Sequence, residues 1–485
     1  MHHAASSAAV GSASPPARAS RIDSMLIRYV FYAAYYLINV LLSRDLVSTL
    51  LTVPTFAVIF ATLRFCPRRQ IGQLDMVALI YFLFFCIVPL QQVERSIFTF
   101  GEIYLLFRYD YLDFAIVHAL AIISYLLLVA GVARSSQQPA PAYSLTPLGR
   151  PLLFGLAVVA ALAGILVQGG VAEVLTPRYL KQDSVLSQAA PLFGAIQSIA
   201  TLLYLIDLRR SRSPFDWAAV ATLIALLLLM ANPFNTARFV LLGVWGPIAL
   251  LTVPILLRPV WFYLVSLFML IIAVPLLSLS TRVGLVDAQE VSSGLTFGSF
   301  FTLKNLNVFE LCLEVIAYTR HSGLRWGETF VSTVFAHVPR AWWPEKPIAS
   351  NLEVGANLVS FFRFTNENMA VPWFMDGYLD FGVAGAIAYA ALAGGVLYVL
   401  NRQLRYTVEG VELYSLVMIS NFLILARGTL AVVFSLFLFQ IITLSLLRRT
   451  LLECVGPIRQ AGFDARAGRS ARVRRDRDHR TTDRS

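Results

Sequence analysis

The chain alternates between long apolar segments and short polar connections. The apolar segments run for about 20 residues, the length that an α-helix needs to cross a membrane. They lack the two-residue alternation that is typical of a transmembrane β-barrel. The pattern therefore predicts an all-α polytopic membrane protein with about 12 transmembrane helices. The predicted spans are 25–42, 46–64, 75–91, 112–133, 151–168, 189–207, 215–231, 238–257, 260–280, 380–400, 411–426 and 429–447.

Arginine is concentrated in every second connection between these segments. Because cytoplasmic loops are enriched in Lys and Arg, these connections and both termini are predicted to lie in the cytoplasm. The opposite side then holds a large loop with short helices, and long ordered loops are usually functional. The predicted organisation is a disordered leader (1–24), nine spans (25–280), the outside loop (281–379), three spans (380–447) and a basic disordered tail (448–485).

Composition supports this assignment and removes several classes of protein. Hydrophobic residues make up 58% of the chain, charged residues only 14%, and the mean hydropathy is +0.69. A soluble enzyme, a coiled coil or a disulfide scaffold would carry a more polar surface or a denser set of cysteines. The net charge of +11 lies largely in the flanks of the spans and in the tail. We therefore expect contact with membrane lipid and no nucleic acid as a partner.

The outside loop carries an unusual run of prolines and tryptophans. Pro339, Pro344 and Pro347 exclude a regular helix and stiffen a turn that presents Arg340, Glu345 and Lys346. The two tryptophans of this turn suit either an anchor at the membrane interface or a platform on which a sugar stacks. They are Trp342 and Trp343.

Several arginines lie on the outside, against the usual bias. Arg238, Arg282, Arg340 and Arg427 are the four that this pattern singles out. A charge near membrane depth is costly unless it has a partner, and such charges are commonly functional. Converging guanidinium groups bind phosphate or pyrophosphate with two hydrogen bonds each. The alternative is that they pair with Asp or Glu, or extend toward the headgroups.

Groups that could transfer a proton are few in the outside loop. His337 stands three residues before Arg340, and Glu328 precedes it on the same loop. A neutral histidine or a carboxylate can accept a proton from a sugar hydroxyl. A structural role for a lone histidine is the simpler alternative. No motif for a metal or a cofactor is present, so neither is expected, and the four scattered cysteines predict no disulfide.

Four strings occur in order along the second half of the chain. They are Asn232-Pro-Phe-Asn-Thr-Ala-Arg238-Phe, Gly327-Glu-Thr-Phe, Pro339-Arg340-Ala-Trp-Trp-Pro344-Glu-Lys346-Pro347 and Gly377-Tyr378-x-x-Phe381-Gly382-x-x-Gly385. This set resembles the oligosaccharide repeat-unit polymerases, the Wzy-type O-antigen and exopolysaccharide polymerases of bacteria. The Pro-Arg-x-x-Trp-Pro-x-Lys-Pro string is its most specific part. One departure is that Asp376 and Asp380 flank Tyr378 where the family pattern would have Glu and Asn.

The resemblance implies a GT-C-like glycosyltransferase on the periplasmic face of the bacterial inner membrane. Its substrates would be oligosaccharide repeat units linked to undecaprenyl pyrophosphate, with a polysaccharide co-polymerase and a flippase as candidate partners. A hydroxyl of the acceptor would attack the anomeric carbon of the donor, and undecaprenyl pyrophosphate would leave. Fixed arginines can stabilise the leaving charge in place of a metal.

The resemblance also assigns roles to the candidate residues. His337 or Glu328 would be the base, and Arg340 would stabilise the leaving group. Substrate would contact Arg238, Arg282, Arg340, Lys346, Arg427, Trp342, Trp343, Asn232, Asp376 and Tyr378.

Three other functions remain open from the sequence. An O-antigen ligase or another lipid-linked glycosyltransferase would use the same donor on the same side of the membrane. A polysaccharide flippase or transporter would place charges within the spans and often shows inverted repeats, and neither feature is visible. A non-catalytic assembly scaffold would not explain arginines at membrane depth.

Overall fold

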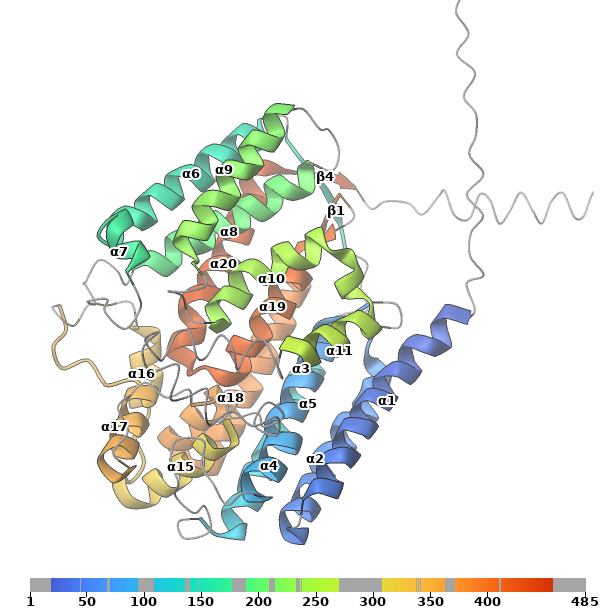
Figure 1. The fold of residues 1–485 in the computed structure, drawn as a ribbon. Helices are drawn as coiled ribbons and strands as arrows, with labels where there is room; N and C mark the ends of the chain where they lie inside the picture. The colour runs from blue at the N-terminus through green and yellow to red at the C-terminus, as the bar shows by residue number, and fades with distance from the viewer. Residues whose placement is uncertain are drawn as a thin grey trace, which may run out of the picture. The chain divides into compact units, whose positions relative to one another are not determined.

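The computed structural model is an all-α membrane protein with a small sheet (Figure 1). Among the residues that the structure describes, seven helices are long and apolar enough to cross a membrane. The chain separates into two compact units, and each is described on its own. The structure describes residues 19–43, 45–67, 70–94, 109–135, 140–146, 148–176, 189–208, 214–232, 236, 238–269, 308–336, 338, 340, 342–362, 371–409 and 411–456.

Unit 1 comprises residues 1–126, 253–323 and 357–366. Its centre is the continuous helical stretch from α3 to α4, in which every residue of α3 and η2 is buried. Asp45 begins α2 by accepting the backbone N–H groups of Val47 and Ser48, as an N-cap aspartate does. The elements of this unit are α1 (Ala19–Leu42), α2 (Leu46–Thr62), η1 (Leu63–Phe65), α3 (Gln73–Phe82), the π-helical turn η2 (Leu83–Ile87), α4 (Val88–Glu94), the first part of α5 (Tyr111–Ser135), η6 (Pro254–Leu257), α11 (Pro259–Phe268) and α15 (Val308–Ser322).

The helix α15 lies in the segment that the sequence assigns to the outside loop. Its residues from Val308 to Ile316 are buried, and the Phe309 ring lies 5.3 Å from the ring of Phe114 on α5. Glu310 and Glu314 are buried with it. The helix is therefore part of the core of unit 1, because it buries apolar side chains on all sides rather than along one stripe.

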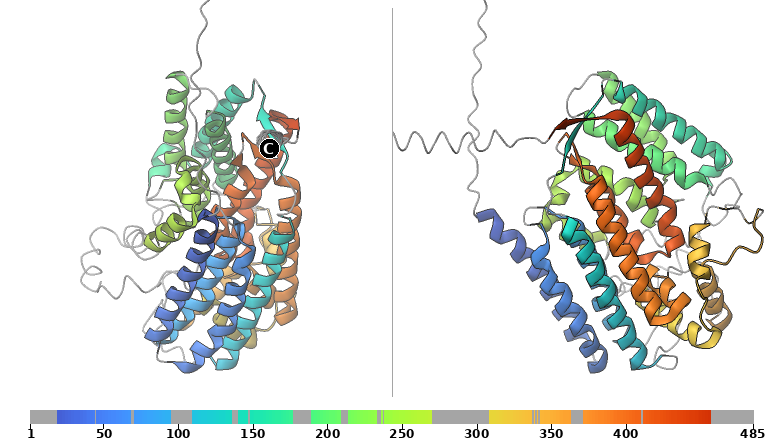
Figure 2. Two further views of the ribbon diagram at one scale, coloured as in Figure 1. Left: turned by 90° about the vertical axis from the view of Figure 1, so that its right-hand side faces the viewer. Right: turned by 180° about the vertical axis from the view of Figure 1, so that it is seen from behind.

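Unit 2 comprises residues 127–252, 324–356 and 367–485. The helix α8 packs against α6, α9, α10 and α20, and the views of Figures 1 and 2 show α6, α8 and α9 side by side. The elements are the end of α5, β1 (Ala142–Leu145), α6 (Gly149–Val167), α7 (Val171–Leu175), α8 (Ala190–Asp207), α9 (Pro214–Met230), α10 (Arg238–Thr252), α16 (Glu328–Val334), the start of α17 (Ser350–Phe362), α18 (Trp373–Leu404), β2 (Thr407–Val408), β3 (Val411–Glu412), α19 (Leu413–Arg427), α20 (Leu430–Leu451) and β4 (Leu452–Gly456).

A four-stranded sheet with the order β3-β2-β1-β4 closes one end of unit 2. β1 pairs in parallel with β2 and antiparallel with β4. The guanidinium of Arg448 lies 5.9 Å and 5.7 Å from the ring centres of Tyr143 and Tyr406, which is cation–π distance. The sequence predicts disorder from 448 onward, but helix and strand continue to Gly456. The rest of that tail, and the leader up to residue 18, lie outside the described residues.

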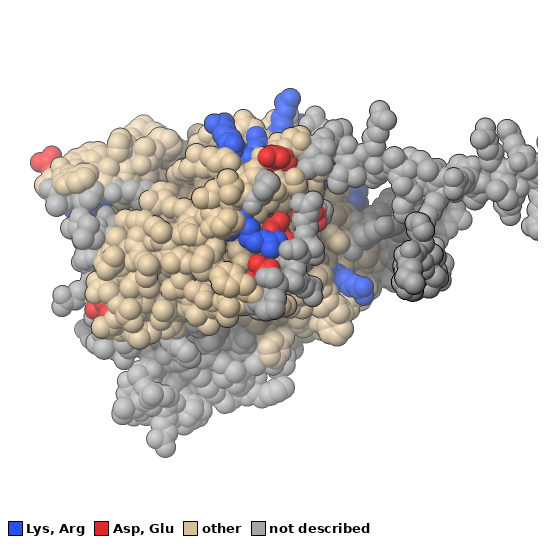
Figure 3. Space-filling view, turned by 90° about the horizontal axis from the view of Figure 1, so that it is seen from above, with Lys and Arg blue, Asp and Glu red and all other residues tan. Residues whose placement is uncertain are grey.

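Helices occupy the positions of all 12 apolar segments, although several bounds differ. α18 begins at Trp373 rather than near 380, and α11 is described only as far as Phe268. Figure 3 shows a face on which acidic and basic side chains gather in one area among neutral residues. Unit 2 includes ion pairs of this kind, such as Arg150 with Asp207 at 2.5 Å. The number of membrane crossings stays a prediction.

Candidate functional site

The helix α18 is broken at Phe381 and Gly382. Gly382 has φ 66° and ψ −148°, a conformation that glycine adopts without strain. A Cβ atom at Gly377 would lie 2.4 Å from the carbonyl oxygen of Gly385. In an unbroken helix these residues would stand about 12 Å apart. The segment 373–380 therefore folds back on the segment after the break, and the glycine string is needed for this contact.

Asp380 ties α16 to the broken helix. Its carboxylate is buried and accepts the backbone N–H groups of Thr329 at 3.1 Å and Phe330 at 3.2 Å. It also accepts the hydroxyl groups of Thr329 and, at 2.6 Å, Tyr389. Gly327, at the N-cap of α16, has no side chain to offer these orphan donors. Asp380 supplies the cap from another helix.

The carbonyls at the break are also satisfied. The backbone N–H groups of Arg325 and Trp326 donate to Leu379 O at 3.0 Å and to Asp380 O at 3.1 Å. Asp376 is buried and accepts the Ser350 hydroxyl at 2.5 Å, which fixes the start of α17. The carboxylate of Asp376, a predicted substrate contact, thus lies inside unit 2 and positions α17.

The loop from 335 to 347 is held by its two cations. The Arg340 guanidinium donates to Lys346 O at 2.8 Å and Pro347 O at 3.3 Å. The Lys346 ammonium donates in return to Val338 O at 2.7 Å and Ala336 O at 3.3 Å. Within the described residues, neither cation forms an ion pair with a carboxylate. We call this pair, Arg340 and Lys346, the loop cation pair.

No carboxylate of the described residues lies within ion-pair distance of the loop cation pair. Partial burial and the nearby charge of Arg340 lower the pKa of Lys346 below its ordinary value of 10.5. Carbonyl dipoles orient the two cations but do not cancel their charge. An anion with several oxygen atoms would gain from both groups, and a guanidinium can bind it with two hydrogen bonds.

Two tryptophans lie within this loop. Trp342 is 81% exposed, so its ring is open to a ligand or to a membrane. Trp343 is half-buried and meets the ring of Phe335 edge to face at 5.4 Å. The sequence predicts the same role for both, and in the structure Trp343 packs on Phe335 while the Trp342 ring is exposed.

Glu328, one of the two candidate bases, begins α16. It forms an exposed ion pair with Arg325 at 3.3 Å, and Arg325 also pairs with Glu353 on α17. An exposed pair of this kind contributes about 0–1 kcal/mol, so Glu328 can exchange its partner. The geometry therefore leaves the carboxylate accessible from outside the unit.

For the remaining candidate residues the structure describes only part of the surroundings or none. Arg238 is the first residue of α10 and Arg427 the last of α19, while their side chains lie outside the described part of the structure. Arg282 and His337 are also outside the described residues. Asn232 and Tyr378 are half-buried.

A polar network in the helix core of unit 2 was not expected from the sequence. The Asn421 amide donates to Gln440 Oε1 at 2.9 Å, and Gln440 donates to Gly243 O at 3.1 Å and Ser198 Oγ at 3.5 Å. The network joins α8, α10, α19 and α20, two of which carry Arg238 and Arg427 at an end. The sequence signal for this network is the presence of two amide side chains, Asn421 and Gln440, inside apolar segments.

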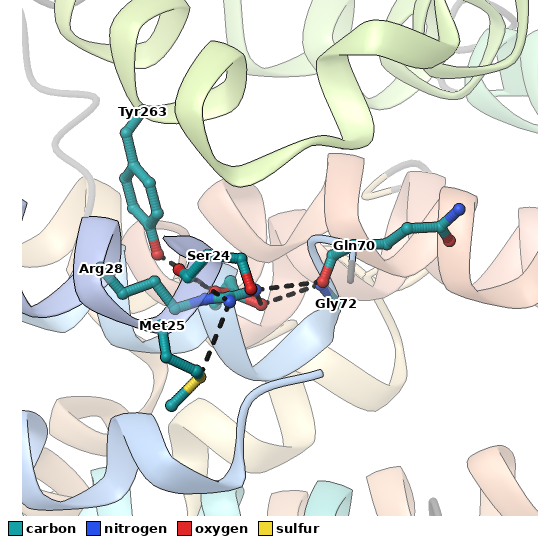
Figure 4. Close-up of polar contacts among 7 residues, drawn as sticks. Ser24, Met25, Arg28, Gln70, Gly72 and Tyr263 are labelled. Carbon is teal, nitrogen blue, oxygen red and sulfur yellow. Dashed lines mark hydrogen bonds and ion pairs between the residues drawn. The ribbon is translucent and has the colours of Figure 1, made fainter. Parts of the chain in front are cut away.

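Arg28 is a further residue whose role the sequence misses. It lies near the start of the first predicted span, 25–42, and in the structure it is buried in α1 and pairs with Asp75 at 2.5 Å. Tyr263 from α11 donates to the same carboxylate at 3.1 Å (Figure 4). The sequence shows the charge but not its partner on another helix.

The chain was compared with protein families, curated proteins and solved structures. No family model, curated protein or solved structure matches it. The functional argument therefore depends on its own residues and on the resemblance of its motifs.

Proposed function

We propose that this protein is a membrane glycosyltransferase that polymerises undecaprenyl-pyrophosphate-linked repeat units into O-antigen or exopolysaccharide. It would act on the periplasmic face of the bacterial inner membrane, with 12 crossings and both termini in the cytoplasm. The observation that carries the proposal is the loop cation pair, Arg340 and Lys346, which is ordered by carbonyls and retains its charge.

The chemistry requires such a charge at the leaving group. When the acceptor hydroxyl attacks the anomeric carbon of the donor, the bond from that carbon to the pyrophosphate oxygen breaks. Negative charge grows on the pyrophosphate, and fixed donors that are already oriented stabilise it. Arg340 and Lys346 are in place for this, and Arg238, Arg282 and Arg427 are proposed to add to it.

The acceptor side of the reaction needs a base and a sugar contact. Glu328 is exposed and bound only by an exposed ion pair, which suits a carboxylate that accepts the hydroxyl proton. His337 is the alternative base. The exposed ring of Trp342 is proposed to stack on a sugar of the repeat unit.

The experiment is the analysis of lipid-linked glycans in a deletion strain, with their membrane side determined. Single repeat units on the periplasmic leaflet, without longer chains, would support the polymerase. Long chains retained on undecaprenyl pyrophosphate would indicate a ligase instead. Single units trapped on the cytoplasmic leaflet would indicate a flippase, and an unchanged profile would contradict all three.

A further inference from the structure

One face of α18 is apolar and exposed over the whole length that follows the break. The exposed positions recur every three to four residues, as on one side of a helix. The opposite face is buried, and Gly394 approaches Gly131 of α5 so closely that a Cβ at Gly131 would lie 2.3 Å from Gly394 O. The exposed positions are Val383, Ala384, Ile387, Ala388, Ala391, Leu392, Gly395, Val396 and Val399. We call this set the α18 stripe.

The α18 stripe has the length of a membrane crossing. It ends at Arg402 and Gln403, which are exposed and polar. From Arg402 back to the break at Phe381 the helix rises by about 30 Å, at 1.5 Å per residue. The hydrocarbon core of a bilayer is about as thick. If Arg402 lies among the headgroups of one leaflet, Phe381 reaches the interface of the other.

The apolar surface continues beyond the break onto α16. The ring of Trp326 lies 6.3 Å from the ring of Phe381, and Trp326 is 75% exposed. Phe330 of α16 is also exposed, and its ring centre lies 6.1 Å from that of Tyr389 on α18. Val334 is exposed one turn further along α16. Trp326, Phe330, Val334 and Phe381 form the α16 patch.

Polar groups border the α16 patch. Arg325 precedes Trp326 in the chain, and it pairs with Glu328, the first residue of α16, and with Glu353 of α17. Tryptophan beside charged groups is typical of the membrane interface, where the ring meets the acyl chains and the charges meet water. The α16 patch meets the start of the α18 stripe at Phe381, and its chemistry matches the depth that the length of α18 predicts.

We propose that the α16 patch is seated in the membrane interface opposite Arg402, in direct contact with the phospholipids of that leaflet. The loop cation pair follows α16 directly in the chain, so α16 would hold Arg340 and Lys346 near the level of the headgroups. On the proposed function, this is the level at which the pyrophosphate of a lipid-anchored donor lies. The lipid contact itself does not depend on that function.

Tryptophan fluorescence can test the proposal on the full chain. The chain has seven tryptophans, and a variant that retains only Trp326 would be placed in vesicles of phosphatidylcholine with brominated acyl chains. These vesicles contain no polyprenyl lipid. We expect bromine near the headgroup to quench Trp326 several-fold more than bromine near the chain ends, and iodide in the water to quench it little.

The matched control retains only Trp373, which begins α18 and is buried. We expect bromolipid and iodide each to quench Trp373 several-fold less than bromine near the headgroup quenches Trp326. Strong quenching of Trp326 by iodide, with none by either bromolipid, would overturn the proposal. The outcome does not depend on any glycan assay, so it separates the lipid contact from the proposed activity.

If the single-tryptophan chains do not fold, an environment-sensitive fluorophore at Val334→Cys in the Cys454→Ser chain gives a second measurement. Cys454 is the exposed cysteine of the described residues. The emission should shift to the blue in vesicles relative to the same label at Glu345→Cys, which lies on the exposed turn. Equal emission at both positions would contradict the proposal.

Discussion

Two arginines of this protein, Arg28 in unit 1 and Arg340 in unit 2, differ in the partners that satisfy them. Arg28 is fully buried and donates to both oxygens of Asp75, at 2.5 Å and 3.2 Å. Its other donors reach Ser24 O and Gln70 O. Arg340 is exposed, and within the described residues its hydrogen bonds all go to backbone carbonyls of its own loop.

The difference separates a structural cation from one that can still bind an anion. The Arg28–Asp75 pair is neutral as a unit, and the N–H of Gly72 and the hydroxyl of Tyr263 complete its hydrogen bonds. Removing one partner would leave an uncompensated buried charge. Carbonyl groups fix the direction of the Arg340 guanidinium, and no carboxylate of the described residues pairs with it. A preorganised anion site requires this combination.

The largest expected effect is the loss of one partner from the buried pair. Arg28→Met should lower the free energy of unfolding by roughly 3–5 kcal/mol, because Asp75 remains buried without its cation. The measurement is thermal unfolding of the purified protein in detergent. Arg405→Met is the control, since Arg405 and Glu412 are part-exposed and their pair should contribute about 0–1 kcal/mol. A loss no larger than that of the control would contradict the structural role of Arg28.

The second effect concerns the cap that Asp380 gives to α16. Asp380→Asn keeps the shape but turns an NH2 group toward donors, so we expect a loss of about 2–3 kcal/mol from hydrogen bonds to a charged group. Hydrogen exchange of the Thr329 and Phe330 amides should accelerate. Glu345→Gln, at an exposed position of the loop, is the control and should leave the exchange unchanged. Unaltered protection of both amides in Asp380→Asn would show that the cap is dispensable.

The third effect is on the proposed activity. Arg340→Lys keeps the charge but loses the planar fork, and we expect polymer formation to fall about 100-fold, as for loss of a transition-state donor. The measurement is the yield of polymer from lipid-linked repeat units at equal amounts of folded protein. Arg402→Lys, at the far end of the α18 stripe, should retain activity. Wild-type polymer levels in Arg340→Lys would remove Arg340 from the site.

The sequence predicts the helices of this protein better than the partners of its charges. Local hydrophobicity predicts a helical segment, so its position can be read along the chain. Asp75 lies far from Arg28 in sequence, and Asp380 lies far from Thr329. Such pairs form only when the helices meet, and no local pattern encodes which carboxylate will meet which donor.

The glycine string shows the same limit in another form. Its residues were recognised as a pattern, but the reason for Gly377 and Gly385 is the contact across the break at Gly382. The prolines of the 339–347 turn did predict an irregular loop that presents Arg340 and Lys346. The sequence could not show that each cation would be held by the carbonyls that flank the other.

The smallest expected effect is the pH dependence of anion binding by the loop cation pair. Lys346 binds an anion as the ammonium, and its pKa in the free protein is lowered by partial burial and by Arg340. Relative to the affinity of Lys346→Arg, which cancels the titration of the anion itself, affinity for inorganic pyrophosphate should therefore be constant at neutral pH and fall as the pH rises through this lowered pKa. The fall should be at most about tenfold per pH unit, because one proton is involved. In Lys346→Arg the guanidinium stays charged through the same pH range, so the affinity of this variant for pyrophosphate should not fall there. Calorimetric titration of both proteins across the alkaline range measures the difference, and parallel profiles would mean that Lys346 does not touch the anion.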